Sequence, residues 1–231
     1  LGKAWQPLSF SGDGEFEAAP VVFAGYGLVA PASGDFPEYD SYVHLDVKDK
    51  WVMVLRDMPQ DIKPEMHQHL ARYSAPRRKA TVARDLGARG IIFVAGPTSG
   101  VKNELIRFDR DASAAGVSMA VVSIDNETAA KMMAKAEKDL AQEQKGLDSG
   151  EMAMGYELPS VTVSASVGIE RKTGTGRNVL GRLRTGTQEQ PMVIVGAHID
   201  HLGVGGGTSS LATDDERDQV HVGADDNASG V

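Results

Sequence analysis

Apolar residues gather into short runs that predict the strands of a buried sheet. Such runs lie at residues 19–27, 51–56, 91–95 and 119–124. Each is followed by Gly, Asp or Pro within a few residues, and these residue types end strands and begin turns. Runs this short and apolar are typical of strands inside a core. The first two thirds of the chain are therefore expected to hold several buried strands.

Helical patterns lie between these strands. Over residues 77–88, small residues such as Ala80 and Ala83 recur on one face, and the basic side chains, Lys79 among them, are expected on the exposed sides. A strand, a helix and a strand at this spacing predict a crossover unit with two parallel strands. A second helix is expected to begin after Asp125 or Asn126 and to run to about Gln144.

Other parts of this region read as loops. Residues 57–76 contain three prolines, which argue against a long helix there. His67 and His69 lie in that stretch, and a solvated loop is the better interpretation of them than a metal site. Residues 31–42 and 96–116 are also expected to be loops because they are rich in Gly, Pro and acidic residues or are bounded by glycine.

The last third of the chain predicts a new run of strands. Short strands are expected at 161–163, 178–183 and 192–197, and the third is almost wholly apolar, as suits the middle of a sheet covered on both faces. A domain boundary is most plausible near 158–175. We divide the chain into a first domain at 1–160 and a second at 161–231.

Composition and charge exclude several classes of protein. The chain has 231 residues and a net charge of -8, and its last thirty residues hold six acidic side chains against one arginine. That balance attracts cations and makes nucleic acid a poor partner. No apolar run approaches the ~18 residues of a membrane span, so no membrane-spanning segment is expected. The absence of cysteine excludes thiolate zinc sites and a cysteine nucleophile.

Two segments carry the candidate chemistry. The predicted strand at 192–197 leads into Gly-Ala-His-Ile-Asp-His-Leu-Gly at 196–203, and Gly-Ala-Asp-Asp-Asn-Ala-Ser-Gly follows at 223–230. In an extended chain His198 and Asp200 lie on one side, while His201 points to the other. A carboxylate beside a histidine can hold its second ring nitrogen. Imidazole and carboxylate ligands together suit zinc and similar divalent ions.

Structural interpretations compete with this one. A lone histidine at a strand end is usually structural or solvated, and an Asp-Asp-Asn turn is usually only a turn. Together and in this order, the two segments favour a metal site. The glycines at 203–207 lack the lysine of a phosphate-binding loop, and Ser229 lies outside a Gly-x-Ser-x-Gly motif, so neither nucleotide binding nor serine hydrolysis is supported.

These two segments resemble the first metal-binding motifs of the di-zinc aminopeptidases, a family of co-catalytic exopeptidases. The resemblance implies that His198 binds one zinc ion and that Asp226 bridges two. It implies that Asp200 orients His198, and it gives His201 and Asp225 no ligand role. The cofactor implied is zinc, two ions in the intact enzyme, and the substrate implied is a peptide or protein.

Residues 20–157 are similar to the protease-associated domain that many such enzymes carry as an insert. The similarity lies in the stretches 21–27, 46–57, 78–94 and 119–124. The fold class expected is therefore α/β. It combines a protease-associated domain of mixed strands and about two helices with the first strands of a zinc exopeptidase α/β sheet. Secretion or a periplasmic location is expected from the resemblance alone.

The sequence departs from the family's pattern in one respect. The family needs a Glu-Glu pair, one Glu as general base and one as ligand, and then a further Asp and His, all after the Asp-Asp-Asn turn. The chain has no counterpart of these residues after Asp226. We expect a fragment of a zinc-dependent aminopeptidase that is inactive by itself. The alternative is a non-catalytic protease-associated module that binds peptides or proteins. Substrate preference, the direction of exopeptidase attack, metal identity and oligomeric state stay open.

Overall fold

The computed structural model describes residues 2–101, 104–108, 116–151, 153–171, 175, 177–183, 193–198 and 219. The chain divides into two compact units, Leu1–Lys172 and Thr173–Val231. All of the described helices and strands belong to the first unit. No helix within the described ranges is long and apolar enough to cross a membrane.

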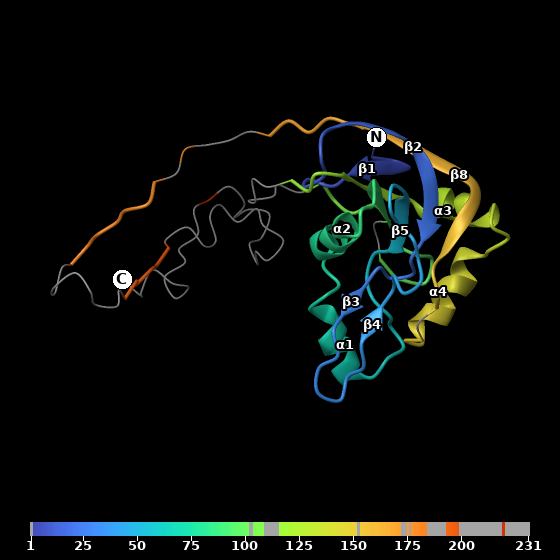
Figure 1. Cartoon of the computed structure of the whole chain (residues 1–231), viewed down its shortest axis with the longest axis horizontal. Coiled ribbons are helices and arrows are strands. Elements are labelled where there is room, and N and C mark those ends of the chain that lie inside the picture. The colour runs from blue at the N-terminus through green and yellow to red at the C-terminus, as the bar shows by residue number, and fades with distance from the viewer. Residues whose placement is uncertain are drawn as a thin grey trace. The chain divides into compact units, whose positions relative to one another are not determined.

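The first unit is built on a six-stranded sheet of order β1-β7-β6-β5-β2-β8 (Figure 1). Its four inner strands run parallel to one another, and the two outer strands, β1 and β8, each run antiparallel to the strand beside them. A small hairpin pairs two further strands, β3 and β4. The strand bounds are β1 Trp5–Pro7, β2 Gly14–Phe23, β3 Val29–Ala30, β4 Tyr39–Asp40, β5 Trp51–Leu55, β6 Gly90–Val94, β7 Ala120–Ile124 and β8 Tyr156–Val167.

Four helices accompany the sheet and cover both of its faces. One face packs against α2, and the other packs against α1, α3 and α4 (Figure 1). Two hydrophobic clusters result, one on each side of the sheet. This two-sided cover explains why the inner strands are apolar without alternation. The helix bounds are α1 Pro64–Ala71, α2 Pro76–Asp85, α3 Asn126–Ala134 and α4 Leu140–Asp148.

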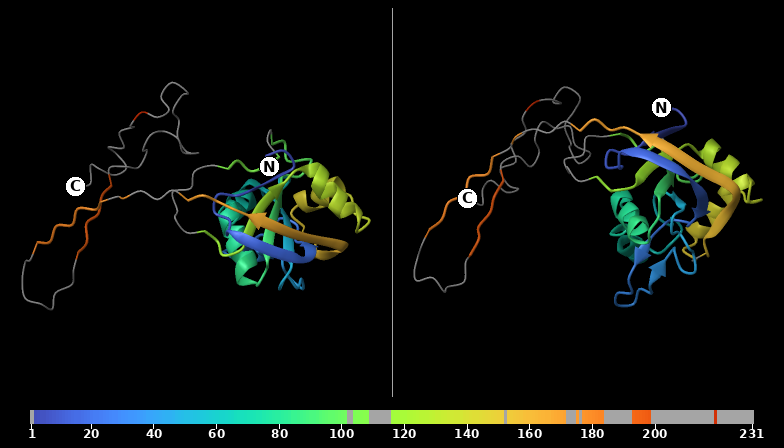
Figure 2. Two further views of the ribbon diagram at one scale, coloured as in Figure 1. Left: turned by 90° about the horizontal axis from the view of Figure 1, so that it is seen from above. Right: turned by 45° about the horizontal axis from the view of Figure 1, so that its top comes forward.

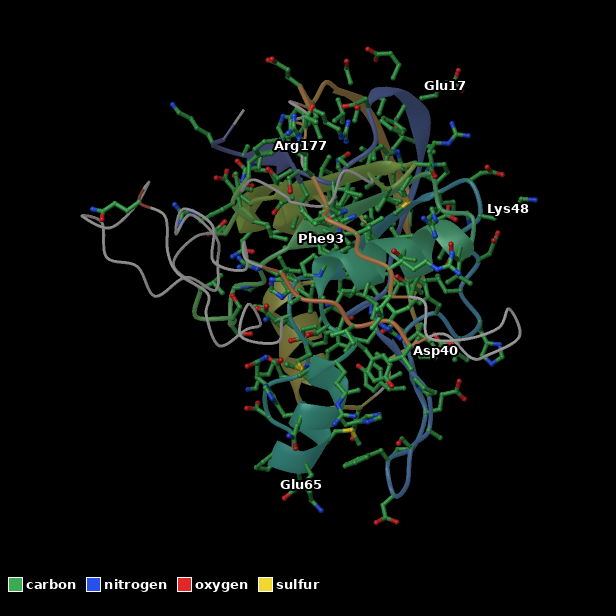
Figure 3. The ribbon with its side chains drawn as sticks, turned by 90° about the vertical axis from the view of Figure 1, so that its left-hand side faces the viewer. Glu17, Asp40, Lys48, Glu65, Phe93 and Arg177 are labelled. Carbon is green, nitrogen blue, oxygen red and sulfur yellow. The ribbon has the colours of Figure 1, made fainter. Side chains whose placement is uncertain are left out.

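The predicted crossover unit is confirmed. Strand β5, helix α2 and strand β6 follow one another, and the two strands pair in parallel with Trp51 opposite Gly90. Every side chain of β5 is 0 % exposed. The Trp51 ring occupies the space beside Gly90, and a Cβ atom at Gly90 would lie 2.5 Å from it. Figure 3 places Phe93 of β6 inside this core, whereas Lys48 and Glu65 point outward.

The single helix predicted from residue 126 to about Gln144 is wrong, because two helices occupy the region. Helix α3 ends at Ala134, and Glu137 has a φ of 56°, which interrupts a right-handed helix. Asp139 then caps α4, its side chain accepting a hydrogen bond of 2.9 Å from the Gln142 N–H. The expected cap at Asp125 is present and bonds the Thr128 N–H at 2.8 Å. A second capping aspartate is therefore what divides the segment.

The proline-rich stretch at 57–76 also differs from the prediction. It holds a short helix, α1, in which Pro64 takes the first turn, where its missing N–H does no harm. His67 and His69 lie on this helix rather than in a solvated loop. His69 is buried and stacks on Phe36, with ring centroids 4.7 Å apart. The expectation that no long helix forms here holds, since α1 has eight residues, but the solvated loop expected around the two histidines is wrong.

The strands predicted at 178–183 and 192–197 are not strands where the structure describes them. Residues 178–183 and 193–198 have no regular secondary structure. Their apolar side chains lie in solvent, Val179 at 98 % and Val193 at 85 % exposure. An apolar run becomes a strand when neighbouring strands supply hydrogen bonds and other elements cover its faces, and no described element does so here.

The strand predicted at 161–163 is confirmed as part of the longer β8. This strand pairs with β2 and so belongs to the first unit's sheet. The predicted domain limit between residues 160 and 161 falls inside β8, while the chain divides into its two compact units between residues 172 and 173. The identities we assign to the two domains stay predictions.

Candidate functional site

The predicted metal ligands lie in the second unit, and the structure describes only one of them. His198 ends the described stretch 193–198, which is exposed and has no regular secondary structure. Asp200 and Asp226 lie outside the described residues, as do His201 and Asp225. The structure therefore neither brings the three predicted site residues together nor separates them. Their grouping stays a prediction from the sequence.

The donor chemistry of these residues suits zinc, which accepts imidazole nitrogen and carboxylate oxygen. Within the described ranges, no group of three or more His, Asp or Glu side chains is placed to hold a metal ion. This holds also for the stretch around His67 and His69. The first unit therefore offers no competing metal centre among its described residues.

The first unit has its own polar network, beyond the carboxyl ends of the parallel strands. In open α/β sheets this edge is where ligands bind. Asp148, at the end of α4, is buried there and accepts hydrogen bonds from the Tyr26 hydroxyl, the Gln60 N–H at 3.2 Å and the Thr98 hydroxyl at 3.3 Å. Gln144 accepts one from the Thr98 N–H at 3.0 Å.

This network holds loops together rather than exposing a reactive group. Burial raises the pKa of Tyr26, and the hydrogen bond to Asp148 and the charge of that carboxylate raise it further. The Tyr26 hydroxyl thus stays protonated, with its proton directed to Asp148. Three donors from separate loops satisfy a carboxylate that would otherwise be costly to bury. No pattern in the sequence predicts this network, since its partners lie up to 122 residues apart.

Lys79 is the most unusual buried group in the first unit. The sequence pattern predicts it on an exposed side of its helix, but it is 1 % exposed. Its Nζ donates hydrogen bonds to three backbone carbonyl groups at the end of β5 and just after it, those of Leu55 at 3.0 Å, Arg56 at 2.9 Å and Asp57. Burial lowers the pKa of Lys79 to about 7, and the charge of Asp57 opposes that shift. Position 79 lies next to the core position 80 and one helical turn before the core position 83, so its side chain also points toward the sheet.

A cavity of about 490 Å³ lies between the β3–β4 hairpin, helix α1 and the loop after α4. Its wall is mainly apolar and includes Tyr39, Ile62, Met66 and Leu70. Its charged members are Glu38, Asp61 and Lys63. Burial raises the pKa of Tyr39 to about 12, so its hydroxyl is neutral at physiological pH. A cavity of this size and lining suits an apolar side chain better than a metal ion.

Comparison with known proteins bears on the second unit. Residues 178–231 match the family model of peptidase family M28. The match supports assignment of this region to a family of zinc peptidases. Both predicted metal-binding segments, at 196–203 and 223–230, lie within the matched residues. A search of curated proteins finds no match.

The family match has a defined extent. It covers a region beginning five residues after the boundary between the two compact units and includes none of the first unit. It supports a hydrolase acting on peptides, which agrees with the function expected from the motifs. The first unit is a mixed α/β fold with four helices rather than the expected two. Its resemblance to a protease-associated domain stays a prediction.

Proposed function

We propose that this chain forms part of a zinc-dependent aminopeptidase that removes N-terminal residues from peptides. The observation that carries the proposal is the match of residues 178–231 to peptidase family M28, because it spans both motifs. The finer assignment, to an aminopeptidase with two zinc ions, rests on the resemblance of those motifs. The same resemblance supports a secreted or periplasmic location.

Each site residue has a distinct role in this proposal. His198 would hold zinc through a ring nitrogen, and Asp200 would accept a hydrogen bond from the other nitrogen, which would fix the tautomer and raise the basicity of the ligand. Asp226 would hold the zinc ions through its carboxylate. When bound, the zinc ions supply Lewis acidity toward a carbonyl group and a water molecule. Asp200 thus acts through His198, as a positioning residue.

We further propose that residues 1–231 alone do not hydrolyse peptides. The resemblance calls for a general-base glutamate and later ligands, and no residue after Asp226 matches them. The exposed apolar side chains of Val193, Ile194 and Val195 support the same proposal, because a strand of this composition needs neighbours on both faces. A longer chain that supplies those elements is expected to be active.

Zinc binding tests the site without relying on activity. Equilibrium dialysis of the 231-residue protein should detect zinc binding that His198→Ala and Asp226→Asn each weaken at least tenfold, an effect on the order of 1.4 kcal/mol or more. The neighbouring residues provide matched controls, since His201→Ala and Asp225→Asn should leave binding unchanged. An equal loss of zinc affinity in the ligand variants and in the control variants would contradict the assignment of ligands.

Activity tests the remainder of the proposal. The 231-residue protein should release no chromophore from a leucyl substrate with added zinc, while a chain extended by the rest of the peptidase domain should do so. In the extended chain His198→Ala should abolish turnover and His201→Ala should not. Zinc-dependent turnover by the 231-residue protein itself would contradict the need for further residues.

The cavity of the first unit favours a second candidate function, a module that binds peptides. Its apolar wall beside Met66 and Leu70 could take a hydrophobic side chain. A titration followed by NMR should then show shifts at these residues with peptides that contain Leu or Phe. Met66→Arg should remove the shifts and leave zinc binding intact. If the peptide causes the same NMR shifts in Met66→Arg, the cavity is not its binding site and the proposal of a peptide-binding module loses its support.

A further inference from the structure

The two outer strands of the first unit's sheet differ in how well their open edges are protected. Strand β1 has three residues and ends in Pro7, which lacks an N–H. Strand β8 has twelve residues, and Figure 2 shows it along the outside of the sheet beside β2. Short strands and prolines are common devices against edge-to-edge pairing. The edge at β1 has both of them.

The second half of β8 lacks such devices. Residues 161–167 read Val-Thr-Val-Ser-Ala-Ser-Val and contain no charge and no proline. Within the described part of the chain, the backbone of these residues pairs with β2 only. Ser160, with a φ of 58°, and a shift of register near it separate this segment from the first half of the strand. A second shift of register lies within the segment, where Glu17 and Ala18 of β2 stand opposite Ser164 alone. Residues 161–167 themselves alternate in exposure without a break over about 23 Å, and their outer edge is open.

The same seven residues have a pattern that is symmetric about Ser164. Exposure alternates along them, with Val161, Val163, Ala165 and Val167 toward the core and the hydroxyl residues toward solvent. If a second copy pairs antiparallel with Ser164 opposite Ser164, apolar residues lie opposite apolar residues, Val161 with Val167 and Val163 with Ala165. Thr162 then lies opposite Ser166 on the solvent face. Residues directly opposite share a face, so no polar group meets an apolar one.

We propose that residues 161–167 of β8 pair with the same residues of a second copy of this chain and join two sheets across a two-fold axis. A two-fold axis presents the same surface twice, so an edge that is complementary to itself is what such a contact requires. The half-buried side chains of Val161, Val163 and Ala165 gain cover from their counterparts. The contact is one strand wide, which places it among small, reversible interfaces.

Cross-linking tests the register directly, because the chain has no cysteine of its own. Opposite residues of an antiparallel pair have Cα atoms about 4.5–5.5 Å apart, within disulfide range. Ser164→Cys in the full chain should form a covalent dimer under mild oxidation. Thr162→Cys alone should form no dimer, because Thr162 of one copy lies opposite Ser166 of the other and the two Thr162 positions are four residues out of register. A mixture of Thr162→Cys and Ser166→Cys should form one. Ser33→Cys, in an exposed loop, is the matched control.

A charge exchange at the axis gives a second test that needs no covalent bond. Sedimentation equilibrium on the order of 100 µM protein should show a dimer for the unaltered chain. Ser164→Lys and Ser164→Glu should each weaken it several-fold through repulsion of like charges, and an equimolar mixture of the two should restore it. Ser33→Lys should have no effect.

The proposal is overturned by any of three results. The first is that the unaltered chain stays monomeric at that concentration, whether or not the β8 edge binds an extended peptide of another sequence. Ser164→Cys could cross-link no faster than Ser33→Cys or Thr162→Cys. Self-association could survive both charged variants unchanged, which would place the contact elsewhere on the chain. Circular dichroism confirms that each variant is folded.

Discussion

Two apolar stretches of this chain lie in opposite surroundings. Trp51–Leu55 forms the centre of the sheet, and all its side chains are 0 % exposed. Val193, Ile194 and Val195 are just as apolar, yet they are 78–85 % exposed and belong to no strand. The comparison shows that apolarity alone does not make a strand. The five residues of β5 are buried because other parts of the chain surround them.

The surroundings of β5 can be named. It pairs in parallel with β2 on one side and β6 on the other, so both edges are hydrogen-bonded. Helix α2 covers one face, and α1, α3 and α4 cover the other. No described element does this for residues 193–195. The free energy of burying a strand therefore comes from elements remote in sequence, and it is lost when they are absent.

Amide hydrogen exchange should show the largest difference between the two stretches. Amides of residues 51–55 should exchange only through global unfolding, which costs about 5–15 kcal/mol in ordinary domains. Amides of residues 193–195 should exchange almost as fast as in an unstructured peptide. Exchange followed by NMR on the 231-residue protein measures both. Equal protection in the two stretches would contradict the exposure described here.

Truncation of one side chain in each stretch should differ almost as much. Trp51→Ala empties a fully buried site and should lower the free energy of unfolding by about 3–5 kcal/mol. Ile194→Ala removes a side chain that is 80 % exposed and should change it by less than about 0.5 kcal/mol. Urea denaturation of both variants gives the comparison. A large loss of stability for Ile194→Ala would show that its stretch is packed in solution.

A smaller effect should come from adding atoms beside Trp51. Gly90→Ala would place a Cβ atom 2.5 Å from a ring that has no room to move, and overpacking of this kind costs about 1–3 kcal/mol. Gly146→Ala is the matched control, because no atom lies within 4 Å of a Cβ there and the residue is inside α4. This control should be stabilising by about 0.5–1 kcal/mol. Equal effects at the two glycines would mean that the contact with Trp51 is not rigid.

Much of the first unit could be predicted from sequence, for a physical reason. Buried parallel strands are continuous apolar runs, so β5, β6 and β7 stand out, and the helix between β5 and β6 has small residues on its inner face. The predictions were wrong where one residue type is compatible with two local structures. Pro64 begins a helix and does not prevent one, and Asp139 caps a second helix where a single long helix was predicted.

The candidate site was predictable in a different way. His198, Asp200 and Asp226 were found by residue type and spacing, and the family match covers the same region. Their spatial grouping depends on contacts between distant residues, which local spacing does not contain. The same limit explains why Asp148 and Lys79 were missed, since both are satisfied by groups that come from other parts of the chain.

The last prediction concerns pH, and it tests whether the groups that cover β5 include the charged form of Lys79. Burial lowers the pKa of Lys79 to about 7, below its value near 10.4 in an unfolded chain. Between these values the unfolded state binds one more proton than the folded state. The free energy of unfolding therefore rises with pH in this window, by about 1 kcal/mol per pH unit. Below pH 7 both states are protonated, and this dependence ends.

Lys79→Met isolates the contribution. Tyr26, Tyr42 and Tyr156 have raised pKa values because they are buried, so above pH 10 their ionisation favours the unfolded state in both proteins. The difference in unfolding free energy between the unaltered chain and Lys79→Met should rise from pH 7 to pH 10. Urea denaturation at four pH values measures it. A constant difference would mean that the three carbonyl oxygens keep the amine charged, and that the loop after β5 is held by a buried ammonium ion throughout this range.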